Sequence, residues 1–326
     1  MPSQIFRNIF LFTIISFVER GINYIISLVL SFYLVPEELG KLTYVLTIQA
    51  YMYPLILCYT NGANLLHYSK KNDGLNYFFN SNIVNIISFI IVGILANTVV
   101  FFLDRSLMTV LLSLLIISLF DAIRLNFLSY NQAITNIKNY AVVAVIFVVL
   151  NLFFTFYLLS KYNNNYLQRI NAMLISNVVT LFLVAYLLNF KVAVKKQKQD
   201  INNVLSYGLP LLPHAFGLIT IESMNRYFLD IYTTKHELGL YSFAFTLAAP
   251  IGILNTAFGT AWAPQMYKLI HQNDEQSKHK IVNISALYIT AILLSCISLS
   301  LLSSFIIHNF FPERYYDSIK YLKITS

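Results

Sequence analysis

The chain has 326 residues, of which 57% are hydrophobic and only 11% charged, and its mean hydropathy is +0.64. Soluble globular domains carry about 25% charged residues, so this composition excludes a soluble protein. The net charge of +8 does not indicate a nucleic-acid-binding protein, because the basic residues lie between apolar stretches and not along one helix face. No nucleic acid partner is therefore expected.

Apolar stretches long enough to cross a bilayer recur along the whole chain and predict an all-α polytopic membrane protein. Gly208, Pro210 and Pro213 interrupt the start of the seventh stretch, and Pro54 is expected to bend the second. The connections are short, so no independent soluble domain is expected. The nine expected helices are 9–34, 42–68, 80–103, 107–130, 140–160, 169–190, 204–231, 239–267 and 280–308.

The distribution of Lys and Arg between these helices predicts the orientation. With the N-terminus in the cytoplasm, the inner connections carry more basic residues than the outer ones, and the largest group consists of Lys191, Lys195, Lys196 and Lys198. Lys161 and Arg169 are assigned to an outer connection. The predicted location is a multi-pass protein of the bacterial cytoplasmic membrane with a cytoplasmic N-terminus.

An internal repeat predicts two bundles of the same orientation. Glu38, Leu39 and Gly40 match residues 237–239, and flanking positions match at the same offset. Six helices separate the two copies, an even number, and parallel repeats of this kind are a known transporter plan. The expected organisation is a six-helix bundle at 1–190, a basic cytoplasmic linker at 191–203, which can also lie against anionic lipid, and an incomplete three-helix bundle at 204–326.

Acid–base pairs inside apolar stretches give the candidate site, because ionisable groups are costly within a membrane. The pairs fall in the first, fourth and seventh helices, and the first and seventh are repeat equivalents. Simple mutual neutralisation of the fourth-helix pair and exposure of the seventh-helix arginine at the membrane interface remain alternatives. The six residues are Glu19 and Arg20, Asp121 and Arg124, and Glu222 and Arg226.

Arg20 is the strongest single candidate. At about 1.5 Å per residue it lies ~16 Å into the first helix, near the middle of a ~30 Å hydrocarbon core. Glu19 is adjacent in sequence and points about 100° away, so the two side chains do not pair face to face. His214 is a candidate proton-linked group, and the alternative, which the sequence favours, is an ordinary interfacial histidine beside a helix break.

Several segments resemble one transporter family. They are YGLPLLPH (207–214), NRYFLDIY (225–232), ELGLYSFAF (237–245), TAWAPQMYKL (260–269) and LSFYLVPEELGKLTY (30–44). Together they resemble the Wzx-type lipid-linked oligosaccharide flippases of the multidrug/oligosaccharidyl-lipid/polysaccharide exporter superfamily. Asn225 departs from the family pattern, in which an aspartate is expected. Because family members have twelve or more helices, the resemblance also predicts that the chain is truncated at its C-terminus.

The resemblance implies translocation of a polyprenyl-diphosphate-linked oligosaccharide by alternating access, for O-antigen, capsule or exopolysaccharide biosynthesis. A diphosphate suits arginine, whose guanidinium binds phosphate oxygens bidentately. The implied partners are this substrate, membrane lipids, and a polysaccharide polymerase with its assembly proteins. The alternatives are a multidrug extruder of the same superfamily and a membrane-embedded polymerase or acyltransferase. No metal cluster, phosphate-binding glycine loop or nucleophile motif is found, so no cofactor, metal or enzymatic activity is expected.

Overall fold

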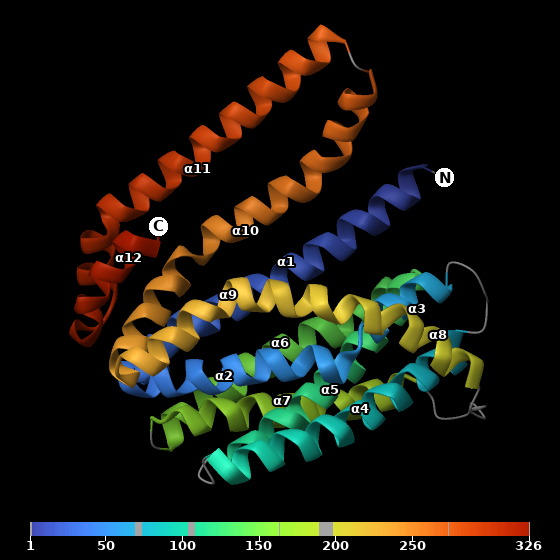
Figure 1. Ribbon diagram of the computed structural model, residues 1–326, viewed down its shortest axis with the longest axis horizontal. Helices are drawn as coiled ribbons and strands as arrows, with labels where there is room; N and C mark the ends of the chain where they lie inside the picture. The colour runs from blue at the N-terminus through green and yellow to red at the C-terminus, as the bar shows by residue number, and fades with distance from the viewer. Residues whose placement is uncertain are drawn as a thin grey trace. The chain divides into compact units, whose positions relative to one another are not determined.

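The computed structural model describes residues 2–68, 74–103, 108–162, 164–188, 198–272 and 274–325 (Figure 1). Within these residues every regular element is helical, and nine segments are long and apolar enough to cross a membrane. The predicted all-α polytopic membrane protein with nine spans is therefore confirmed.

The helices are α1 Pro2–Tyr33, α2 Pro36–Leu57, α3 Thr60–Tyr68, α4 Gly74–Leu103, α5 Met108–Ala133, α6 Ile137–Lys161, α7 Tyr166–Leu187, α8 Lys198–Gly208, η2 Leu209–Leu211, α9 Leu212–Tyr232, α10 Lys235–Gln272, α11 Glu275–Phe310, η3 Glu313–Ser318 and α12 Ile319–Thr325.

The starts of several helices follow from local residue chemistry. Proline stands at the first position of α2, where its missing N–H costs nothing, and Glu37 and Glu38 follow in the first turn, where they favour the helix dipole. Asn136 and Asn165 cap α6 and α7 by accepting backbone hydrogen bonds from residues three positions ahead. These signals place the start of α2 earlier than the predicted residue 42.

Two of the nine spans are broken. The span Pro36–Leu66 consists of α2 and α3, which are separated at Cys58 and Tyr59. Both residues have positive φ angles, 46° and 51°, a conformation that disfavours side chains larger than glycine's. The span Asp200–Tyr232 is likewise made of α8, η2 and α9, as the glycine and prolines near 208–213 predict.

The break after α2 is held by residues that are distant in sequence. With its amide nitrogen turned toward them, Asn85 of α4 donates to the carbonyl oxygens of Ile56 and Leu57, at 3.3 and 3.2 Å. These are carbonyls that the end of a helix leaves without partners. Gly208 packs so closely against the same break that a Cβ atom there would overlap the carbonyl group of Cys58.

The described helices form two compact units. Unit 1 comprises Met1–Ile26 and Lys41–Thr233, and unit 2 comprises Ser27–Gly40 and Thr234–Ser326. Contacts define these units, whereas the predicted bundles 1–190 and 204–326 rest on the repeat, so those bundle boundaries stay a prediction. Of the predicted linker, residues 191–197 lie outside the described part, and α8 begins at Lys198.

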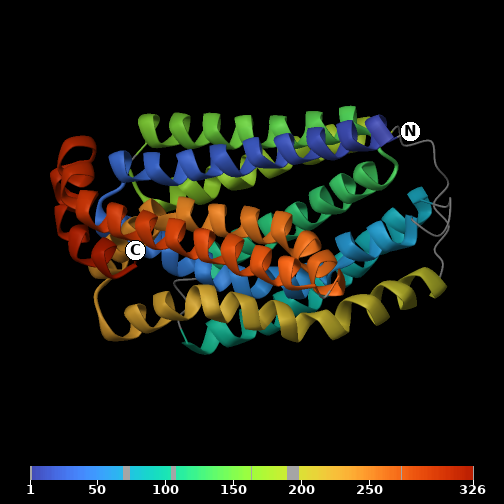
Figure 2. The same cartoon turned by 90° about the horizontal axis from the view of Figure 1, so that it is seen from above.

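Unit 1 has a core of tightly packed apolar residues between α4, α5, α6 and α7. Phe78, Phe127, Tyr140 and Val184 contribute one buried side chain from each of these helices. Figure 2 shows α6 and α7 side by side within this unit. The core fixes the positions of α5 and α6, which carry part of the candidate site.

Unit 2 brings the two copies of the repeated sequence into contact. A Cβ atom added to Gly40 would overlap the carbonyl group of Lys235, and one added to Gly239 would overlap that of Pro36. The two glycines therefore sit where the first turns of α2 and α10 pack backbone against backbone, as small residues allow at helix crossings. We call this contact the glycine crossing.

The segment after α11 packs against the same end of unit 2. Arg314 donates to the carbonyl oxygens of Ser31 and Phe32 at 3.0 and 2.7 Å, and the Tyr315 hydroxyl donates to that of Leu34 at 3.0 Å. The end of α1 and the segment after α11 are thus neighbours. Successive spans cross a membrane in alternating directions. Eight of the nine described spans follow α1, an even number, so the end of α1 and the end of α11 are expected on the same side of the membrane.

Candidate functional site

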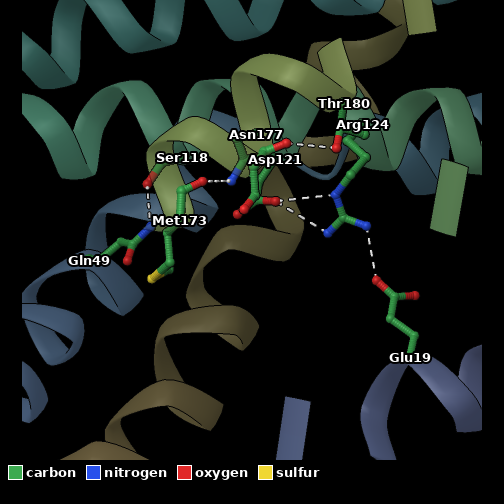
Figure 3. A network of polar contacts seen from close by, with 9 residues as sticks. Glu19, Gln49, Ser118, Asp121, Arg124, Met173, Asn177 and Thr180 are labelled. Carbon is green, nitrogen blue, oxygen red and sulfur yellow. Dashed lines mark hydrogen bonds and ion pairs between the residues drawn. The ribbon is translucent and has the colours of Figure 1, made fainter. Parts of the chain in front are cut away.

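A charged cluster lies inside unit 1, among the spanning helices (Figure 3). Arg124 of α5 donates from Nη1 to Glu19 Oε1 of α1 at 2.9 Å. It also donates from Nη2 and Nε to Asp121 Oδ1, at 3.2 and 3.3 Å. The guanidinium carbon lies 3.9 Å from the ring centroid of Phe147, on α6. One cation is therefore held by two carboxylates and an aromatic ring from three helices.

The spacing of the residues explains the local geometry. Asp121 and Arg124 are three positions apart and so share one face of α5. Glu19 lies on α1, which packs on α6 through the edge-to-face contact of Phe12 with Tyr140, whose ring centroids are 4.9 Å apart. The side chains of the cluster are only 11–20% exposed, so their attraction is screened less than that of a surface ion pair.

Neutral polar groups lie on the Asp121 side of the cluster. Gln49 of α2 donates to the hydroxyl of Ser118 on α5 at 3.3 Å, and Asn177 of α7 donates to the carbonyl oxygen of Met173 at 3.0 Å. Figure 3 shows both pairs beside Asp121. These residues come from α2, α5 and α7, so a patch of hydrogen-bonding groups adjoins the charges inside an otherwise apolar bundle.

The structure brings together three of the predicted site residues, which are Glu19, Asp121 and Arg124. It does not bring Arg20 into this cluster: Arg20 is exposed and makes no hydrogen bond or ion pair with any described residue. Thus the acid of the first helix faces the cluster, and the neighbouring base points elsewhere. The mutual pairing of Asp121 and Arg124, left open by the sequence, is present and is extended by Glu19.

The residues predicted on the seventh helix lie on α9. Arg226 is half-buried and lines a cavity of about 510 Å³, whereas Glu222 and His214 are exposed. Neither Glu222 nor His214 belongs to the charged cluster on α5. The roles assigned to all seven residues stay predictions.

Arg169 is a buried cation, although its place in the sequence predicts an outer connection. It lies in the first turn of α7, is 9% exposed, and donates to Asn151 Oδ1 and to Thr155 Oγ1, the latter at 2.8 Å. Asn151 and Thr155 are four positions apart on one face of α6, a polar pair within an apolar stretch that could have indicated a buried partner. Within the described part of the chain no carboxylate pairs with Arg169.

Asp200 is a second buried charge that was expected in the linker. It is 8% exposed in the first turn of α8 and accepts a hydrogen bond from Asn80 Nδ2 of α4 at 3.0 Å. Nearby, Asn126 links Thr60 and Asn82 through two further side-chain hydrogen bonds of 2.8 Å each. These buried amides join α3, α4, α5 and α8. No group of three or more His, Cys, Asp or Glu among the described residues could hold a metal ion.

Comparison with known proteins shows the family of the chain. Residues 5–270 match the family described as "Polysaccharide biosynthesis protein". The chain belongs to this family. It is the family of Wzx-type flippases, so the resemblance predicted from the sequence motifs is confirmed.

A relative in the same comparison is consistent with the family. The chain is 29% identical over 170 residues to "Lsg locus putative protein 1" of Haemophilus influenzae. The aligned part covers 50% of this chain and 42% of the relative, so the match spans less than half of the relative's length. The family match and the nine apolar helices of the described residues agree on a membrane protein of a polysaccharide-biosynthesis family.

Proposed function

We propose that this chain acts in the translocation of a polyprenyl-diphosphate-linked oligosaccharide across the bacterial cytoplasmic membrane by alternating access, for surface polysaccharide biosynthesis. The observation that supports the proposal most is the buried cluster of Arg124 with Glu19 and Asp121. Charged groups inside membrane spans mark pathways for polar substrates. The family match over residues 5–270 supplies the class of substrate, a lipid-linked polysaccharide precursor.

In this proposal Arg20 contacts the diphosphate. Arg20 is exposed and makes no ion pair with the described residues, so its five N–H donors are available for phosphate oxygens. The adjacent Glu19 is fixed by Arg124, and this holds the part of α1 that carries Arg20. Arg124 then acts as a positioning residue.

The remaining expectations belong to the same proposal. The N-terminus lies in the cytoplasm, and His214 is a proton-linked group. A polysaccharide polymerase and its assembly proteins are the functional partners, since a flipped precursor is the substrate of a polymerising reaction.

Arg20 variants test the proposal in a strain that lacks its own flippase, with surface glycan and membrane abundance measured together. Arg20→Ala is expected to abolish glycan export at normal abundance, because Arg20 supports no described contact whose loss would unfold the protein. Arg20→Lys should retain part of the export, since lysine keeps the charge but loses bidentate geometry. Lys161→Gln, an exposed cation on α6, is the matched control and should export normally.

Normal glycan export by Arg20→Ala at normal abundance would contradict the role of Arg20. The same strain distinguishes the rival transporter: if the wild-type chain fails to restore glycan but lowers sensitivity to cationic drugs, it is a multidrug extruder. Glycan that is exported but fails to polymerise when the chain is deleted would indicate the membrane-enzyme alternative.

A further inference from the structure

An apolar groove of about 510 Å³ runs along α2 within unit 1, in the size range of small-molecule sites. Its inner wall is formed by core residues: Met52, Val92 and Leu111 are only 7%, 8% and 3% exposed. Its outer rim is open, since Leu95 and Val99 of α4 are 62% and 55% exposed. The groove therefore opens sideways, toward the surface that faces lipid in a membrane.

One charged side chain lies among the described residues that line the groove, and it is Arg226 of α9. Arg226 is six residues before the end of α9 at Tyr232, or ~9 Å along the helix axis. The antiparallel packing of α2 on α9, fixed by the stacked rings of Tyr51 and Phe216, places the start of α2 at the same end. The groove thus has a cation near one membrane interface and hydrocarbon walls that continue toward the membrane centre.

The length of the groove follows from its lining on α2. Tyr44 and Leu55 both line it and are eleven residues apart, which corresponds to ~16 Å of helix. This is about half of the ~30 Å hydrocarbon thickness of a bilayer. A slot of this kind suits an amphiphile that has a long hydrocarbon chain and a single anionic head at one end.

We propose that this groove binds the isoprenoid chain of a polyprenyl phosphate, with Arg226 contacting the phosphate. The proposal rests on the proposed function, which supplies a polyprenyl carrier. Guanidinium and phosphate form short, bidentate, charge-assisted hydrogen bonds. Arg226 has five N–H donors, so its guanidinium can bind a phosphate while it keeps its contact within the protein. The isoprenoid chain lies against Val99 and Leu95 on one side and against Met52 on the other.

The purified chain in detergent tests the proposal by native mass spectrometry, with C55 polyprenyl monophosphate as the probe. The same titration is made with C55 polyprenol, which lacks the phosphate, and with phosphatidylglycerol. We expect the monophosphate to bind more tightly than both. Arg226→Gln should weaken monophosphate binding about tenfold and leave polyprenol binding unchanged, as loss of a charge-assisted hydrogen bond predicts.

Val99→Trp fills the groove and should weaken binding of both isoprenoids about tenfold. Val149→Trp is its matched control, because Val149 is also about half exposed, at 49%, but lies on α6 away from the groove. If Val99→Trp does not give a folded protein, Leu95→Trp replaces it. Equal binding of the monophosphate by wild type, Arg226→Gln and the tryptophan variant overturns the proposal. Equal binding of phosphatidylglycerol also overturns it, since the groove would then be a general lipid site.

The glycan-export assay separates failure of this site from failure of the proposed function. If the wild-type chain binds the monophosphate through the groove but never restores glycan export, the groove stands and the proposed function falls. If export is restored while binding is insensitive to both variants, the function stands and the groove falls.

Discussion

Arg124 faces two carboxylates, so the removal of different members of the cluster has unequal effects on stability. Arg124→Gln leaves Glu19 and Asp121 partly buried without their cation, and the free energy of unfolding should fall by about 2–4 kcal/mol. Glu19→Gln leaves Asp121 in place, so its cost should be about 1 kcal/mol. Unfolding of the purified variants in mixed detergent micelles measures both.

The double variant Glu19→Gln with Arg124→Gln is the control for this interaction. Its loss of unfolding free energy should be smaller than the sum of the losses of the two single variants, because the two residues share one contact. Strictly additive losses would show that the ion pair contributes nothing.

Arg169 leads to the opposite expectation, because its partners are neutral. Burying a guanidinium costs several kcal/mol, and Asn151 and Thr155 offset that only in part. Arg169→Met, which keeps the volume and removes the charge, should therefore leave the melting temperature unchanged or raise it. Asn151→Leu should lower the free energy of unfolding by about 1–3 kcal/mol, since the cation then loses an acceptor. If Arg169→Met destabilises the protein as much as Asn151→Leu does, the cation itself is stabilising.

At the scale of helices, the glycine crossing of α2 and α10 is a tightly constrained contact. Gly40→Ala and Gly239→Ala each place a methyl group into the backbone of the partner helix, which has no side chain there to move aside. We expect each variant to lose about 1–3 kcal/mol of stability from overpacking. Gly217→Ala in α9 is the matched control, because a Cβ atom there meets nothing within 4 Å.

The control should be neutral or up to ~1 kcal/mol more stable, since alanine favours a helix interior over glycine. Melting temperatures of the three variants in one detergent decide the matter. Equal melting temperatures for Gly40→Ala and Gly217→Ala would contradict the close backbone contact between α2 and α10.

The sequence predicted the helices better than it predicted their ends and breaks. Continuous apolar stretches determine where a span lies, so all nine were found. The break at Cys58 was not predicted, because neither Cys58 nor Tyr59 is a residue that favours the left-handed conformation. Its causes, Asn85 and Gly208, are distant in sequence and meet the break only in the folded chain.

The candidate site shows the same division. Asp121 and Arg124 could be paired from their spacing alone, because helix geometry is local. Which member of the Glu19–Arg20 pair faces them depends on how α1 is rotated against α5, and a single sequence contains no signal for that. Arg169 was missed for a related reason, since a charge near the end of an apolar stretch is indistinguishable from a loop residue until its partners on the next helix are known.

For the molecule as a whole, the orientation in the membrane is the first property to test. In a chain with Cys58→Ser and Cys296→Ala, single cysteines are introduced at Lys138 and Lys161, exposed positions at opposite ends of α6. Cys58→Ser keeps a donor for the carbonyl oxygen of Leu55. An impermeant thiol reagent should label Lys161→Cys in intact cells and Lys138→Cys only after permeabilisation. The reverse pattern would place the N-terminus outside.

The contact between Tyr315 and Leu34 has a consequence for biogenesis. Its two ends are 281 residues apart, so the turn between α1 and α2 gains the Tyr315 hydroxyl as a partner only after 281 further residues have been synthesised. At roughly 5–20 residues per second, that interval is about 15–55 s. During this time the carbonyl groups of the turn have only water or lipid headgroups as partners. The turn therefore marks, for a membrane quality-control protease, a chain that has not yet reached Tyr315.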